Sequence, residues 1–419
     1  MTMQPTDTKT NILYLSYDGM TDPLGQSQVI PYLQGLSKAG YSFTLISFEK
    51  AERFEKNRAA IAAMLKQSDI DWVPLPYTKK PPVLSTLRDL SKMESTAKSI
   101  HRKKHFKIIH CRSYIAAIAG MHMQQQFGVK FIFDMRGFYA DERVEGGIWK
   151  LSNPIFKRVY DFFKKKEQQF LSTADYTISL TKKGKDIIHS WANIKNQPIP
   201  IQVIPCCADL DLFSEKSIDP GLLQQLRNQF NLSGNEFVLS YLGSVGTWYM
   251  LDEMLDFFKC LLHFKPDAKF LFITGEPASG ILTKAKSKDI PEACFIITAA
   301  PHKQVPTYLA LSNCSIFFIK PVFSKSASSP TKQGEIMGMG MPHICNAGVG
   351  DVDDIIDERS GVLIKTLNDA EYEKAIQKLL NSTFDKEYIR KRSQEIYALS
   401  AGVEKYEQVY KAVVKACTP

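Results

Sequence analysis

Residues 326–335 read SASSPTKQGE, and residues 338–342 read GMGMP. The small hydroxyl residues ahead of Pro330 predict the start of a helix there. The first backbone N–H groups of a helix and its dipole favour a phosphate group, and Lys332 adds a positive charge at the same end. Glu335 follows on the same face about one turn later, where a carboxylate can accept hydrogen bonds from both hydroxyls of a ribose. The alternative is an ordinary capped helix with a surface pair between Lys332 and Glu335.

The sequence on both sides of this stretch alternates between short β-rich runs and helical periods, which is typical of parallel sheets with crossover helices. The predicted strands are 11–16, 44–47, 71–75, 108–110, 130–133, 176–180 and 202–204, followed by 237–242, 269–274, 294–298, 315–319, 343–345 and 361–364. Helices are predicted over 26–38, 51–66, 85–101, 113–126, 154–171 and 181–191, and throughout 370–416.

The fold class is therefore α/β, with two doubly wound, Rossmann-like domains and a ligand cleft at the carboxyl ends of their strands. No strand period holds between the two sets of strands, and Asp219-Pro220-Gly221 marks a turn there. We predict an N-terminal domain over 1–208, a linker over 209–235 and a C-terminal domain over 236–399.

The bulk composition excludes several classes of protein. Hydrophobic residues make up 44% and charged residues 23% of the 419 residues, which are ordinary globular values. No apolar run is long enough to cross a membrane, and the polar start (1–10) lacks the apolar core of a secretion signal. The eight cysteines are scattered without a C-x-x-C pair, which disfavours a zinc site and a disulfide framework. These features predict a cytoplasmic protein without a bound metal.

The net charge of +9 is unevenly distributed. Residues 1–200 hold 30 Lys and Arg against 18 Asp and Glu, whereas the remainder holds 23 against 26. A basic first half beside a mildly acidic second half suggests a different partner for each. No nucleic-acid-binding motif accompanies the positive charge, so nucleic acid is not a predicted partner.

The combination of SPTK at 329–332, Glu335 and GMP at 340–342 resembles the donor-site pattern of glycosyltransferase family 4. This resemblance implies a GT-B fold that binds a nucleotide-diphosphate sugar as substrate and uses no cofactor. It also implies that the serine-rich turn with Lys332 holds the donor diphosphate, and that Glu335 holds the ribose. The residues assigned to the turn are Ser328, Ser329 and Thr331.

Three further segments resemble the same family in the same order. The loop SYDGMTDPLGQSQ (16–28) follows the first strand, and its Gly25 and Gln26 are predicted to face the donor, because a glycine lets the backbone approach a ligand. The loop LGSVGTWY (242–249) resembles a second phosphate-contacting loop, with Gly243 and Ser244 as its predicted contacts. The closing helix, 400–419, resembles one that returns to pack on the N-terminal domain.

The sequence departs from the family pattern at three places. The second loop lacks the usual arginine and lysine, so Lys332 is the obvious source of positive charge. Ala327 stands where relatives often have an acidic residue that touches the donor sugar, which implies an unusual donor sugar, backbone contacts or lost activity. Arg136 stands where relatives often have a histidine, and its guanidinium suits a phosphate or carboxylate rather than proton transfer. Nearby, Asp141 and Glu142 could orient or activate an acceptor hydroxyl, unless this is an ordinary solvated loop.

Basic side chains accumulate in the first domain beside apolar ones. Lys157, Arg158 and the lysines at 164–166 share the helix predicted over 154–171 with Ile155, Val159, Phe162, Phe163 and Phe170. The usual interpretation is an apolar core face with a solvated lysine face. The alternative is contact with an anionic membrane, to which each basic residue near the surface contributes on the order of 1 kcal/mol.

The sequence thus predicts a metal-independent, retaining glycosyltransferase with Arg136, Asp141, Glu142 and Lys332 as candidate catalytic residues. Its predicted partners are a nucleotide-sugar donor, a saccharide or lipid-linked acceptor of bacterial-type polysaccharide assembly, and an anionic membrane surface. Two alternatives stay open: a nucleotide-sugar epimerase on the same fold, and a catalytically weakened nucleotide-sugar-binding protein.

Overall fold

The computed structural model describes residues 9–415 and divides into two compact units. Unit 1 contains the chain as far as Pro205 and again from Leu399, and unit 2 runs from Cys206 to Ala398. Most of the polar start (1–8) and the end of the predicted terminal helix (416–419) lie outside the described residues. The predicted linker, 209–235, lies within unit 2 and contains a helix of its own.

Unit 1 is built on a seven-stranded sheet in the order β3-β2-β1-β4-β5-β6-β7, with every neighbouring pair parallel. The strands are β1 (Thr10–Ser16), β2 (Tyr41–Glu49), β3 (Ile70–Pro76), β4 (Ile108–Arg112), β5 (Lys130–Asp134), β6 (Tyr176–Ser179) and β7 (Ile201–Val203). Each strand coincides with a predicted run. The runs are continuously apolar because helices cover both faces of the sheet, so that Ile12, Leu13 and Leu15 of one strand are all inaccessible to solvent.

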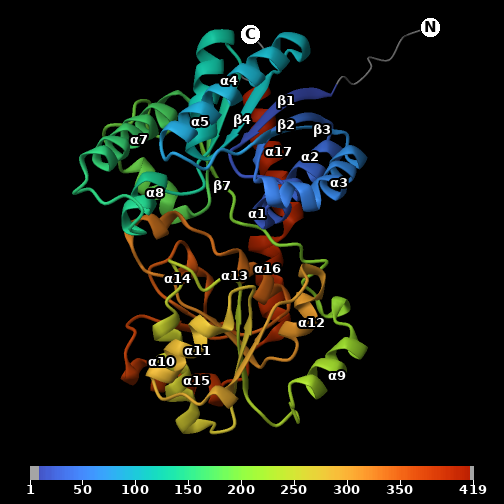
Figure 1. Ribbon diagram of the computed structural model, residues 1–419, viewed down its shortest axis with the longest axis vertical. Coiled ribbons are helices and arrows are strands. Elements are labelled where there is room, and N and C mark those ends of the chain that lie inside the picture. The colour runs from blue at the N-terminus through green and yellow to red at the C-terminus, as the bar shows by residue number, and fades with distance from the viewer. Residues whose placement is uncertain (1–8, 416–419) are drawn as a thin grey trace. The chain divides into compact units, whose positions relative to one another are not determined.

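The helices of unit 1 lie on both faces of this sheet. They are α1 (Pro23–Gln28), α2 (Ile30–Lys38), α3 (Ala51–Gln67), α4 (Leu84–Lys104), α5 (Ser113–Phe127), α6 (Tyr139–Glu145), α7 (Pro154–Thr173), α8 (Lys182–His189) and α17 (Leu399–Lys415). The single helix predicted over 26–38 is divided at Val29, because Pro31 in the first turn of α2 cannot continue a preceding helix. The last helix, α17, packs against α2 in unit 1, as the family resemblance implied (Figure 1).

Unit 2 repeats the architecture with a six-stranded parallel sheet in the order β10-β9-β8-β11-β12-β13. The strands are β8 (Val238–Leu242), β9 (Lys269–Ile273), β10 (Phe295–Thr298), β11 (Cys314–Phe317), β12 (His343–Asn346) and β13 (Gly361–Ile364). The α-helices are α9 (Pro220–Gln229), α10 (Leu251–Phe264), α11 (Ala278–Ser287), α12 (Val305–Leu309), α13 (Thr331–Gly338), α14 (Val352–Ile355), α15 (Asp369–Asn381) and α16 (Lys386–Tyr397). Short 3-10 helices lie at η1 (Glu215–Ser217), η2 (Glu292–Cys294), η3 (His302–Gln304) and η4 (Phe323–Ala327).

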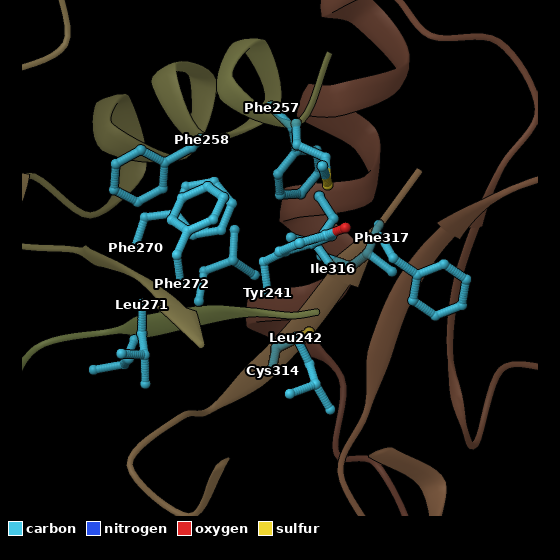
Figure 2. Packing of buried hydrophobic residues seen from close by; sticks show 14 of the residues in the cluster. Tyr241, Leu242, Phe257, Phe258, Phe270, Leu271, Phe272, Cys314, Ile316 and Phe317 are labelled. Atoms are coloured by element: carbon cyan, nitrogen blue, oxygen red, sulfur yellow. The ribbon is translucent and has the colours of Figure 1, made fainter. Parts of the chain in front are cut away.

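Aromatic side chains fill much of the core of unit 2. Figure 2 shows Phe258 of α10 beside Phe270 and Phe272 of β9. The ring centroids of Phe258 and Phe270 are 4.9 Å apart, and Tyr241 of β8 packs 5.6 Å from Phe272. The ring of Tyr241 therefore lies in the core, and its hydroxyl reaches the carbonyl oxygen of Ser244 in the loop after β8.

Within residues 9–415, no helix is both long enough and apolar enough to cross a membrane. The seven cysteines of this part of the chain are all free.

The returning helix α17 is held in unit 1 by two tyrosines. Tyr410 is hydrogen-bonded through its hydroxyl to Nδ1 of His110 on β4 at 2.7 Å, and both side chains are buried. Tyr406 donates its hydroxyl proton to Oδ2 of Asp134 at 3.1 Å. These two hydroxyl contacts, to β4 and β5, hold α17 on the sheet of unit 1.

Replacing Tyr410 by Phe should destabilise the protein by about 1–3 kcal/mol, because a buried ring nitrogen loses its hydrogen-bond partner. Urea unfolding of parent and variant measures the difference. Lys411→Gln is the matched control on the same helix, since Lys411 is 61% exposed and its pair with Glu407 is a surface contact. Equal stability of Tyr410→Phe and Lys411→Gln would contradict the anchoring role of Tyr410.

Candidate functional site

The loops that follow β8 and β11 lie side by side at the carboxyl edge of the unit 2 sheet. The chain leaves β8 for β9 and β10 on one side, then returns to β11, β12 and β13 on the other. Such a reversal of strand order is where open α/β sheets bind ligands. Backbone hydrogen bonds from Met250 to Phe318 (3.0 Å) and from Lys320 to Trp248 (3.0 Å) join the two loops.

Gly243, the first residue after β8, lies directly against Lys332 of α13. Its φ of +107° is a backbone conformation that side chains disfavour, so the position requires glycine. A Cβ built on Gly243 would lie 3.4 Å from the Nζ atom of Lys332. The structure therefore brings together two predicted donor-site residues that are far apart in the sequence.

The ammonium group of Lys332 is surrounded by tyrosines. It is 7% exposed and donates to the hydroxyl of Tyr241 at 2.9 Å. Nζ also lies 3.6 Å from the ring centroid of Tyr249 and 4.1 Å from that of Tyr241. The Tyr241 hydroxyl in turn donates to the carbonyl oxygen of Ser244. Cation–π contacts of this kind stabilise a positive charge that has lost its water.

Burial disfavours the charged forms of both ionisable side chains on α13. It lowers the pKa of the Lys332 amine well below its usual value, and Glu335 only partly opposes this shift. It raises the pKa of the Glu335 carboxyl to about 7, against the opposing effect of Lys332. A diphosphate bound beside Lys332 would favour its protonated form. Lys332 is therefore placed to gain charge stabilisation from an anionic ligand.

The hydroxyl residues of the predicted phosphate turn lie immediately before α13 and at its start. The helix begins at Thr331 and has Pro330 at its N-cap, beside the first helical position, where the sequence predicts a helix start. The Oγ of Ser329 accepts a hydrogen bond from the backbone N–H of Cys206 at 3.2 Å, and it can still donate its own proton. Ser328, Ser329 and Thr331 are each half-buried. Ala327, in contrast, is 2% exposed.

The first predicted loop of unit 1 is fixed by its own packing. A Cβ on Gly25 would lie 2.3 Å from the carbonyl oxygen of Gly19, so this glycine serves contact within the loop. The explanation from the sequence, close approach of a ligand to Gly25, is not needed to account for the residue. Gln26 is exposed and donates from Nε2 to the carbonyl oxygen of Thr21 at 3.2 Å.

Glu49, at the end of β2, holds this loop in place and was missed in the sequence. It is 3% exposed, and its carboxylate accepts hydrogen bonds from the backbone N–H groups of Met20 (2.8 Å) and Thr21 (3.0 Å). The hydroxyl of Ser47 donates to the same carboxylate. The sequence does show an acidic residue at the end of an apolar strand, which could have drawn attention to Glu49. The backbone groups that it binds, however, lie about thirty residues earlier in the chain, and no repeating pattern in the sequence connects the two segments.

Arg136 lies in a buried charged network of unit 1. It has a φ of +60°, and its Nη1 is 3.8 Å from Oδ1 of Asp134 at the end of β5. Burial alone would raise the pKa of the Asp134 carboxyl, but Arg136, His110 and Arg112 together lower it to about 2. An ionised Asp134 therefore faces Arg136, which moderates the positive charge that Arg136 can offer to a ligand.

Asp141 and Glu142 lie in the first turn of α6. Asp141 accepts hydrogen bonds from the hydroxyl of Tyr160 (2.9 Å) and from Nζ of Lys164 (2.9 Å). Lys164 also pairs with the buried Glu167. The three lysines at 164–166 therefore do not share one surface, because Lys164 is drawn inward. Glu142 is half-buried.

The tyrosines around Lys332 are the other site residues missed in the sequence. Tyr241 resembled an ordinary strand residue, and Tyr249 part of a glycine loop. The two tyrosines surround Lys332 because α13 packs against the end of β8. A contact between segments so far apart in the chain cannot be inferred from the local sequence pattern. A similar contact was also missed: Nζ of the buried Lys325 lies 3.8 Å from the ring centroid of Trp248.

No group of three or more His, Cys, Asp or Glu side chains in the part of the chain that the structure describes is placed to hold a metal ion.

Comparison with known proteins gives a consistent result for both units. Residues 28–212 match the family model Glycosyltransferase Family 4, and residues 224–396 match Glycosyl transferases group 1. No curated protein sequence gives a significant match.

Solved structures with the same fold cover almost the whole chain. The sucrose-phosphate synthase of Thermosynechococcus elongatus is 17% identical, with a TM-score of 0.72 over 97% of this chain and 100% of that one. A glycosyltransferase from Rickettsia africae is 15% identical, with a TM-score of 0.70 over 97% and 99%. HepE of Anabaena, in complex with UDP and glucose, is 13% identical, with a TM-score of 0.69 over 96% and 99%.

The raised pKa of Glu335 predicts a loss of stability as the pH rises. Between the unfolded pKa of about 4.3 and the folded value of about 7, the unfolded chain releases a proton that the folded protein retains. Unfolding therefore becomes easier across this range, by up to about 4 kcal/mol, and the loss is complete above the folded pKa.

Glu335→Gln should lack this component, so its stability should change less than that of the parent between about pH 5 and about pH 8. Urea unfolding of both proteins at the two pH values measures the difference. The same pH dependence in both proteins would show that Glu335 titrates as an ordinary surface acid.

Proposed function

We propose that this chain, which belongs to the GT-B glycosyltransferases related to family 4, transfers a sugar from a nucleotide-diphosphate donor to a saccharide or lipid-linked acceptor. The observation that carries the proposal is the buried Lys332 ammonium against Gly243, with Glu335 about one turn further along α13. This arrangement offers a cation to a diphosphate and a carboxylate to a ribose, both on the same helix.

The donor is assigned to unit 2. The N–H of Gln333 donates to the carbonyl oxygen of Pro330 at 3.0 Å. The N–H groups of Thr331 and Lys332, ahead of it, are oriented toward the start of the helix and favour a phosphate there. Ser328, Ser329 and Thr331 would add hydroxyl donors, and Gly243 and Ser244 would border the diphosphate from the other side. The complex of HepE with UDP and glucose supports a nucleotide sugar as the donor class.

The chemical step we propose is displacement at the anomeric carbon of the donor sugar. The bond from that carbon to the diphosphate oxygen breaks and its electron pair stays on the diphosphate. The oxygen of the acceptor hydroxyl forms the new glycosidic bond, and its proton passes to an oxygen of the leaving diphosphate. Lys332 and the helix N–H groups stabilise the charge that develops on the leaving diphosphate. Metal independence and retention of anomeric configuration are the parts of the proposal that rest on the resemblance to family 4.

The acceptor is assigned to unit 1. We propose that Arg136, moderated by Asp134, faces an anionic group of the acceptor. Asp141, which accepts hydrogen bonds from Lys164 and Tyr160, and Glu142 are the candidates to orient an acceptor hydroxyl. We place the reaction in bacterial-type polysaccharide assembly, at the cytoplasmic face of an anionic membrane.

A second candidate is a nucleotide-sugar-binding protein with little turnover. Ala327 favours it, because an alanine side chain cannot hydrogen-bond a sugar hydroxyl. Only turnover separates this candidate from a transferase, since both would use Lys332 and Glu335 to bind a nucleotide.

Incubation with UDP-, GDP-, ADP- and dTDP-sugars tests the proposed function. Slow donor hydrolysis that continues in EDTA is the expected result for a metal-independent transferase. Glu335→Ala should raise the dissociation constant of the preferred donor about tenfold or more, since a hydrogen bond to a charged group contributes about 1.5–3 kcal/mol. An isomerised donor would indicate an epimerase, binding without turnover a binding protein, and loss of turnover in EDTA a metal requirement.

Lys332→Met should lower turnover far more than stability, because it keeps most of the side-chain volume and removes the charge that stabilises the leaving group. Tyr241→Phe is the matched control: it removes the hydroxyl bonded to Lys332 and leaves the ammonium in place. Steady-state rates with the preferred donor should therefore fall in the order parent, Tyr241→Phe, Lys332→Met. Normal turnover of Lys332→Met would show that another group neutralises the diphosphate.

A further inference from the structure

Exposed apolar side chains are concentrated in unit 1. Of the large hydrophobic residues that are exposed between residues 9 and 415, only Phe264 and Phe323 belong to unit 2. The largest group in unit 1 extends from the loop before α7 into that helix. It consists of Ile148 (52% exposed), Leu151 (41%), Ile155 (62%) and Phe162 (45%). We call these four residues the α7 apolar strip.

The α7 apolar strip is an outward surface, contrary to the usual core interpretation of Ile155 and Phe162. These two residues are seven positions apart, or about two helical turns, and so lie on one face. The buried Phe163 and Phe170 lie on the neighbouring face of α7, and the ring of Phe163 contacts that of Phe162 with centroids 5.3 Å apart. The exposed positions are therefore not a consequence of loose packing of the helix.

The loop that carries Ile148 and Leu151 is also fixed. Trp149 stacks on Phe163 with ring centroids 5.7 Å apart, and its backbone N–H donates to the carbonyl oxygen of Arg143 at 2.9 Å. Asn153 caps α7 by accepting from the N–H of Ile155 at 2.9 Å. The exposed side chains of the α7 apolar strip are therefore presented from an ordered backbone.

Basic side chains border the α7 apolar strip. Lys150, Lys157, Arg158 and Lys165 are all exposed, and Asp161 is the acidic residue exposed among them on α7. Arg158 and Lys165 lie three residues after Ile155 and Phe162, respectively, and so stand beside them on the helix. Long basic side chains beside inserted apolar ones are the arrangement by which proteins hold anionic lipid surfaces.

A second segment of the same kind lies at the same edge of the unit 1 sheet. Val83, Leu84 and Leu87 are exposed, with Lys79, Lys80 and Arg88 around them. Both α4 and α7 cross back from the carboxyl edge of a parallel sheet, so both segments lie at that edge. The two helices are also on the same layer, because α4 packs on α5 and α5 packs on α7.

We propose that the α7 apolar strip and its basic border dock unit 1 onto an anionic lipid bilayer, with Ile155 and Phe162 inserted among the lipid head groups. The basic border favours an anionic bilayer as the partner, because its positive charges are complementary to anionic lipid head groups. A second copy of this chain would bring two such positively charged borders together. The proposal rests on the proposed membrane location of the acceptor and not on the chemistry of transfer, so nucleotide-sugar binding serves as an independent measurement.

Sedimentation with vesicles of phosphatidylcholine, with and without phosphatidylglycerol, tests the docking of the full chain. The parent should bind the anionic vesicles, and Lys157→Gln/Arg158→Gln/Lys165→Gln should bind them roughly a hundredfold more weakly, since each basic residue near such a surface contributes about fivefold. Ile155→Ser/Phe162→Ser should also bind more weakly, and that loss should persist at high salt, where charge is screened beyond about 3 Å.

The matched control is Phe264→Ser/Lys265→Gln, an exposed apolar and basic pair on unit 2, which should bind vesicles as the parent does. All variants should bind the nucleotide sugar normally, and their urea unfolding should match that of the parent, which shows that unit 1 is folded as well. Absent binding by the parent, or equal binding by the parent and the triple variant, would overturn the proposal. Self-association of the parent that Ile155→Ser/Phe162→Ser abolishes would also overturn it and assign the strip to a second copy.

Discussion

Every strand in the two sheets runs parallel to its neighbours, so each connection must cross a face of its sheet. For the same reason, all loops that follow strands begin at one edge of the sheet, the edge at which the strands have their carboxyl ends. The first strand of each unit lies inside its sheet, and the chain builds outward from it in one direction before returning to the other side. This constraint gathers residues from distant parts of the sequence at one edge. In unit 2 the parallel arrangement brings the loop after β8 next to the start of α13, and the candidate donor site is formed where these two segments are in contact.

The second loop lacks the usual arginine and lysine, and the sequence pointed to Lys332 as the source of positive charge. The positive charge is provided by α13, and the space above Gly243 is occupied by the Lys332 ammonium itself. Tyr241 and Tyr249 replace part of its hydration with ring faces and a hydroxyl. The ligand-free site therefore holds a cation that is costly to keep charged, and a polyanion would relieve that cost.

The strands could be predicted from the sequence because a strand covered on both faces is a continuous apolar run, as in β1 and β9. The resemblance of 329–342 singled out Lys332, and the structure brings this residue to Gly243 of the second loop. Contacts between distant segments were not predictable. Glu49 binds a loop about thirty residues before it in the chain. Tyr241 and Tyr249 contact Lys332, which lies on α13 and far from both tyrosines in the sequence. The exposure of Ile155 and Phe162 was also missed, because helical spacing identifies a face but not what covers it.

The return of α17 to unit 1 has a consequence for synthesis of the protein. The segment that completes unit 1 is translated only after all of unit 2. At translation rates of roughly 5–20 residues per second, unit 1 would wait on the order of ten to forty seconds without α17. During that interval the surface that later receives Tyr406 and Tyr410 is open to chaperones, and unit 2 has time to fold first. A ribosome that stalls late would release a chain with one finished unit and one unfinished unit, which quality control can recognise by the uncovered face of α2.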